Sequence, residues 1–157
     1  ISTMHVADIA KTREKIYQMA EGMAMATGCK VHYKEIPGYL GRTPNAILGD
    51  LLKAELTYLK EPLMEGMPAD KGGEDLGNVS RVIPACNLFM TLLPERKISG
   101  HTEEFRELAN GEAGRRCLKI SAIAMVMSIV EFLLEPTFSA KAKAVLHQRI
   151  ADEVAYA

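Results

Sequence analysis

The histidine in the stretch SGHTEEF, residues 99 to 105, is the side chain of this sequence best placed to do chemistry. An imidazole titrates near neutral pH and can act as a base, as an acid or as a metal ligand. His101 is the histidine that a glycine turn places beside an apolar, strand-like segment. The others are His5 near the first residue, His32 on the polar side of an alternating segment, and His147 in a charged helix. The alternative is an ordinary surface residue next to a helix start.

A second candidate is the stretch KGGEDLGNVS, residues 71 to 80, in which paired glycines precede two acidic residues. The backbone N–H of Gly73 could approach an anionic ligand, while Glu74 and Asp75 could hold a metal ion or orient a histidine ligand. The alternative is a simple turn with a solvated acidic pair, followed by Asn78 or Ser80 as a helix cap. The sequence contains no HExxH, GxSxG, P-loop or GxGxxG motif that would complete a catalytic set.

The elements that must position these residues begin with a predicted β-α-β unit. Residues 1 to 6 are compatible with a strand, Asp8 is a typical N-cap, and the helix that follows ends at Gly28 with a buried stripe of Ile9, Ile16 and Met23. Residues 29 to 35, CKVHYKE, alternate between apolar and polar and predict a second strand. The turn-rich segment IPGYLGRTPN follows and predicts a domain boundary between residues 43 and 44.

Helices are predicted over residues 46 to 59, after Thr102, over 112 to 135, and from Ser139 onward. Residues 85 to 93 are apolar without a polar period, which is typical of a strand covered on both faces. The predicted fold class is therefore α/β. The chain offers few strands to cover residues 85 to 93 and the apolar helix at 120 to 134, so we expect an absent partner segment or extensive oligomerisation to cover them.

Composition limits the classes of function. The 157 residues carry a net charge of −1 with 6% aromatic residues, which argues against nucleic-acid binding. The 3 cysteines lie far apart and suggest neither disulfides nor a sulfur-rich zinc site, so a cytoplasmic location is expected. The apolar run at 120 to 134 has 15 residues, short of the roughly 20 that span a bilayer, and predicts a buried helix rather than a membrane segment. Because the sequence starts at Ile1, we expect part of a longer protein.

Several stretches together carry a resemblance to a known family: MAEGMAMATGCKVHY, a PN pair before a leucine-rich helix, GGEDLGNVSRVIPA, GHTEEF, and a long apolar helix ending in FLLEP. In this order they resemble the C-terminal part of the dinuclear-metal amidohydrolases. This is the aminoacylase and carboxypeptidase G2-like family, and the branch is that of the aminobenzoyl-glutamate hydrolases. The resemblance covers nearly the whole chain.

The resemblance implies a ferredoxin-like lid that also dimerises, of which residues 1 to 43 would be the second half. Residues 44 to 157 would be the C-terminal part of a mixed-sheet, α/β catalytic domain. It implies that His101 is a ligand to one of two zinc or manganese ions, and that Asn45, Gly73, Glu74 and Asp75 border the substrate. The family's other metal ligands and its glutamate base have no counterpart here.

The expected function is therefore that of the C-terminal part of a metal-dependent amidohydrolase. Its substrate would be a small acyl-amino acid or a dipeptide-like molecule, and a water activated between two divalent ions would cleave the amide or peptide bond. This chain alone would be inactive and would form a homodimer or associate with a missing N-terminal segment. The alternative is a non-catalytic α/β interaction module that dimerises, with a purely structural His101.

Overall fold

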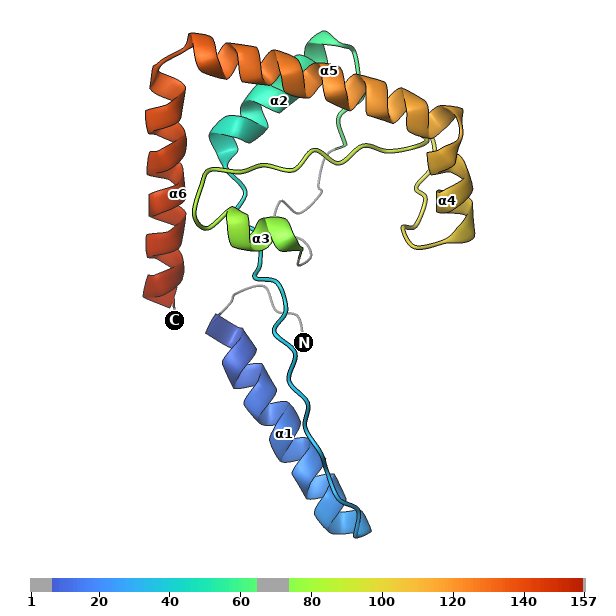
Figure 1. Ribbon diagram of the computed structural model, residues 1–157, viewed down its shortest axis with the longest axis vertical. Coiled ribbons are helices and arrows are strands. Elements are labelled where there is room, and N and C mark those ends of the chain that lie inside the picture. The colour runs from blue at the N-terminus through green and yellow to red at the C-terminus, as the bar shows by residue number, and fades with distance from the viewer. Residues whose placement is uncertain (1–6, 65–73, 157) are drawn as a thin grey trace. The chain divides into compact units, whose positions relative to one another are not determined.

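The computed structural model describes residues 7–64 and 74–156, and this part of the chain is helical (Figure 1). Contacts divide the chain into two compact units. The first contains Ile1–Pro44, Pro68–Ala85 and Leu146–Ala157, and the second contains Asn45–Met67 and Cys86–Val145. The helices of the described residues are α1 (Ala7–Thr27), α2 (Ala46–Tyr58), α3 (Asp75–Val79), α4 (Glu103–Asn110), α5 (Glu112–Leu134) and α6 (Thr137–Tyr156). The predicted domain boundary at 43/44 stays a prediction.

The predicted α/β class is wrong. Within residues 7–64 and 74–156 there is no strand, and the β pairing found there is one isolated parallel bridge between Pro44 and Ala85. Residues 29 to 35 and 86 to 93 are irregular instead of strands, and the predicted strand at 1 to 6 lies outside the described residues. The reason is that a strand needs a neighbour to take its backbone hydrogen bonds, and neither segment has one among the described residues.

Residues 29 to 35 pack against α1 through side chains. The rings of Tyr17 and Tyr33 lie 4.1 Å apart between centroids. The Tyr17 hydroxyl donates a hydrogen bond of 2.5 Å to Glu35, and Arg13 forms an ion pair of 3.2 Å with the same carboxylate. This hydrogen bond to Glu35 raises the pKa of the Tyr17 phenol. Contact with a helix on one side thus produces the same alternation of residue types that a strand shows.

The predicted buried stripe of α1 is only partly buried. Ile9 is half-buried, but Ile16 is 38% exposed and Met23 is 65% exposed. The apolar spacing correctly predicted the helix, and the left-handed Gly28, with φ of +72°, confirms the predicted end of α1. Asp8 lies inside the first turn instead of capping it, because α1 begins at Ala7.

The helix predictions in the second unit hold closely. Both α2 and α5 end within one residue of the predicted positions. The last helix begins at Thr137, two residues before the predicted cap at Ser139, because the Glu135 carboxylate accepts hydrogen bonds from the Thr137 N–H (3.1 Å) and hydroxyl (2.7 Å). These bonds lower the pKa of Glu135.

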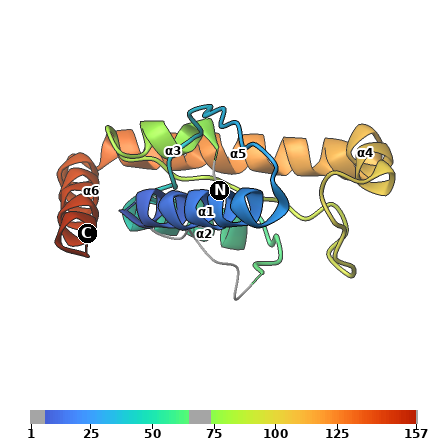
Figure 2. The ribbon, with the colours of Figure 1, turned by 90° about the horizontal axis from the view of Figure 1, so that it is seen from below.

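The core of the second unit lies where α2 packs on α5 (Figure 1), and α4 packs at the start of α5 (Figure 2). From α2 it contains Leu51 and Leu56, and from α5 it contains the small residues Cys117, Ala124 and Ser128. The spacing of these three places them on one face of α5. Small side chains let the two helix backbones approach closely.

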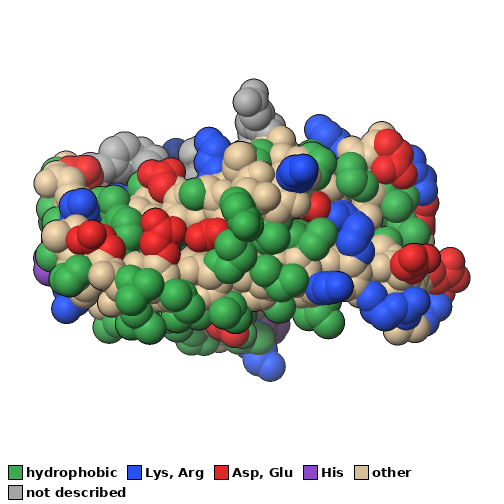
Figure 3. All heavy atoms as spheres, turned by 90° about the horizontal axis from the view of Figure 1, so that it is seen from above, with side chains coloured by type: hydrophobic (Ala, Val, Ile, Leu, Met, Phe, Trp, Pro, Cys, Tyr) green, Lys and Arg blue, Asp and Glu red, His purple; other side chains and the backbone are tan. Residues whose placement is uncertain are grey.

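Residues 120 to 134 are helical as predicted, but the described residues of this chain cover little of the helix, and its burial by a partner segment or a second copy stays a prediction. Only 17% of the most apolar 18-residue window of α5 is buried, and Figure 3 shows hydrophobic side chains gathered along this helix. Within the described residues, α5 is also the one helix long and apolar enough to cross a membrane by length and composition.

Candidate functional site

His101 lies in the turn immediately before α4, and its backbone is left-handed with φ of +60°. The turn is held by Thr102, whose hydroxyl donates to Ser99 O (2.8 Å) and accepts from the Phe105 N–H (3.2 Å). The predicted N-cap at Thr102 is therefore confirmed. The imidazole of His101 is exposed, so a ligand can reach it from solvent.

An open surface concavity of about 940 Å³ surrounds His101. Phe105 and Arg106 line it from the first turn of α4, and Asn110 lines it from the last turn. The Arg106 guanidinium is held by Glu103, whose Oε2 accepts from Nε at 2.9 Å. Its lining therefore combines the apolar ring of Phe105 with the guanidinium of Arg106 and one imidazole.

The residues that the structure describes do not form a complete metal site. Among them, no group of three His, Cys, Asp or Glu side chains is arranged to hold a metal ion. A structural zinc site takes four ligands, and a catalytic one takes three protein ligands. His101 alone therefore does not fit a dinuclear centre, and further ligands would have to come from elsewhere.

Asn45, predicted to border the substrate, is 2% exposed in the second unit. Its Nδ2 donates a hydrogen bond of 2.8 Å to Ala142 O of α6, and its Oδ1 is buried without a hydrogen-bond partner. Asn45 precedes α2 but does not cap that helix with its side chain. Its contacts tie the start of α2 to α6, and the concavity around His101 does not include it.

The predicted residues Glu74 and Asp75 lie at the start of α3 in the first unit, and Gly73 lies outside the described residues. Glu74 forms an ion pair of 3.2 Å with the buried Arg42. The Asp75 carboxylate accepts from the N–H of Leu76 at 3.0 Å. Both carboxylates therefore have local structural contacts, and their role toward a substrate stays a prediction.

The residues after this acidic pair have a role that sequence reasoning missed. Asn78 Oδ1 accepts the Leu40 N–H at 2.8 Å, and Ser80 Oγ accepts the Thr43 N–H at 2.9 Å. Arg81 donates from Nε to Gly41 O at 3.3 Å. Side chains of α3 and the residues just after it thus hold the backbone of residues 40 to 43, and we call this set of contacts the α3 clamp.

Two further features complete the α3 clamp. Gly77 is buried so close to the 40–43 backbone that a Cβ there would lie 1.8 Å from Leu40 O. Arg81 also forms a two-fold ion pair with Glu153 of α6, at 2.5 and 2.9 Å. The available signal was the run GNxSR, in which each polar side chain is short or forked enough to bond backbone groups.

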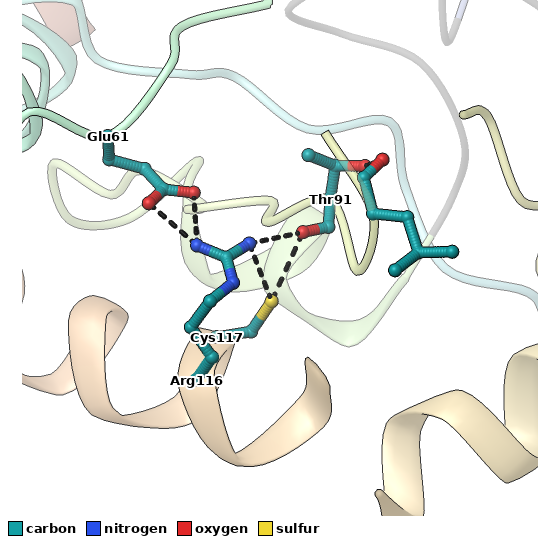
Figure 4. A network of polar contacts seen from close by, with 5 residues as sticks. Glu61, Thr91, Arg116 and Cys117 are labelled. Carbon is teal, nitrogen blue, oxygen red and sulfur yellow. Dashed lines mark hydrogen bonds and ion pairs between the residues drawn. The ribbon is translucent and has the colours of Figure 1, made fainter. Parts of the chain in front are cut away.

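A second polar network lies in the second unit and was also missed (Figure 4). The buried Glu61 carboxylate accepts two bonds from Arg116 Nη1, at 2.9 and 2.7 Å. Arg116 Nη2 and Cys117 Sγ both donate to Thr91 O, at 3.0 and 3.2 Å. The bond to Glu61 raises the pKa of Arg116. This network ties residues 86 to 93 to α5 in place of a strand ladder.

Within the second unit, the concavity that contains His101 does not include Asn45. No protein-family model, no curated protein and no solved structure matches the chain. The amidohydrolase resemblance therefore rests on the sequence motifs alone.

Proposed function

We propose that this chain supplies part of a metal-dependent amidohydrolase that cleaves an amide or peptide bond of a small acyl-amino acid or dipeptide-like substrate. In this proposal, His101 ligates one of two divalent ions, zinc or manganese, through a neutral imidazole. The observation that carries it is the exposed, left-handed His101 at the rim of an open concavity.

The backbone of His101 supports a functional assignment. A residue with a Cβ in the left-handed region costs roughly 1–2 kcal/mol, and glycine adopts the same conformation without this cost. Residues held in such sparsely populated conformations cluster at active sites and ligand-binding sites. Gly100, the residue directly before it, could adopt the left-handed conformation without this cost, but His101 is the residue that adopts it.

The proposal rests on the motifs and on His101, and it uses no feature of the corrected α/β fold. Because the described residues hold no cluster of metal ligands, the remaining ligands and the general base would come from another polypeptide segment. This chain alone is then inactive, and no catalytic step is assigned to its described residues. None of the three cysteines, which all lie within the described residues, forms a disulfide.

The test is metal content and hydrolysis in the protein isolated in its complete assembly. We expect bound zinc or manganese and hydrolysis of N-acyl-amino acids, with both reduced at least tenfold by His101→Ala. His147→Ala, an exposed histidine of α6, is the matched control and should change neither. Metal content and hydrolysis that survive His101→Ala would refute the proposal.

A second candidate is a non-catalytic interaction module, and the open apolar surface of α5 favours it. In that case the assembly would contain no divalent metal and would hydrolyse no acyl-amino acid. Association through α5 alone does not decide between the two functions, whereas metal analysis does.

A further inference from the structure

We draw no further inference here: the strongest candidate, the open apolar concavity of about 300 Å³ that α2, α5 and residues 86 to 88 line within the second unit, carries nothing, because nothing in the part of the chain that the structure describes shows what covers it.

Discussion

Replacing Gly77 by alanine tests whether the α3 clamp holds residues 40 to 43. The added Cβ would lie 1.8 Å from Leu40 O and 2.8 Å from Leu40 C, where ordinary contacts are 3.4–4 Å. The contacting atoms are backbone, so a small rotation of a side chain cannot relieve the overlap. The two backbones must separate by more than about 1 Å, which stretches the bonds that Asn78 and Ser80 accept.

Overpacking of this kind costs about 1–3 kcal/mol, and each stretched hydrogen bond adds roughly 0.5–1.5 kcal/mol. The better helix propensity of alanine offsets about 1 kcal/mol. We therefore expect Gly77→Ala to lower the free energy of unfolding of the first unit by about 1–5 kcal/mol. Faster amide exchange at Leu40 and Thr43 should accompany this loss.

Urea denaturation followed by circular dichroism measures the global effect, and hydrogen exchange measures the local one. Gly22→Ala is the matched control, because Gly22 is inside α1 with nothing within 4 Å of an added Cβ. That control should stabilise the protein by about 0.5–1 kcal/mol. If both variants behave alike, or the Leu40 and Thr43 amides keep their protection, the close approach of α3 to this backbone is refuted.

Four further substitutions test other parts of the structure. Lys60→Gly and His101→Gly should each raise stability by about 1 kcal/mol in thermal denaturation, since both residues have positive φ, of 58° and 60°. Arg116→Met should lower it by about 2–3 kcal/mol in urea, less than for a fully buried pair because Arg116 is one-third exposed while Glu61 is left buried without its guanidinium. Burial, followed by a hydrogen bond with Glu131, raises the pKa of Glu55 in the folded state. Stability from the protonated Glu55 is therefore present below its ordinary pKa and lost as the pH rises through the raised value, and Glu55→Gln should remove this slope in a pH series of melts and raise stability at neutral pH.

The helices could be predicted because each leaves its own local signal. In α2 and α5, apolar residues recur at helical spacing, and the chain breaks with glycine, proline or a capping residue at each end. The strand predictions failed because alternation and apolar runs report which sides of a segment are covered, and they do not name the covering element. Residues 29 to 35 are covered by α1 instead of by a neighbouring strand. In residues 86 to 93, Thr91 O accepts hydrogen bonds from the side chains of Arg116 and Cys117 instead of from a strand backbone.

Of the candidate site, the sequence correctly predicted the turn at His101 and the N-cap at Thr102. The turn at His101 and the cap at Thr102 depend on neighbouring residues, and a short motif is sufficient to indicate them. The other contacts join residues that are far apart in the sequence. The hydrogen bond from Asn45 to Ala142 spans 97 residues, and the one from Thr43 to Ser80 in the α3 clamp spans 37. Such pairings depend on how the chain folds back on itself, and one sequence carries no local signal for them.

Among the residues that the structure describes, the two non-glycine residues with a left-handed backbone, Lys60 and His101, differ in what offsets their strain. At Lys60, the end of α2 forms the paired bonds of a Schellman motif, from Glu61 N to Leu56 O (2.9 Å) and from Lys60 N to Thr57 O (3.0 Å). Helix termination therefore explains the conformation of Lys60. No such helix end precedes His101, and the bonds of its turn belong to Thr102. If the conformation only redirected the chain, glycine at 101 would improve stability at no cost to any other property. A simultaneous gain in stability and loss of bound metal in His101→Gly would instead show that the imidazole is kept for its ligand.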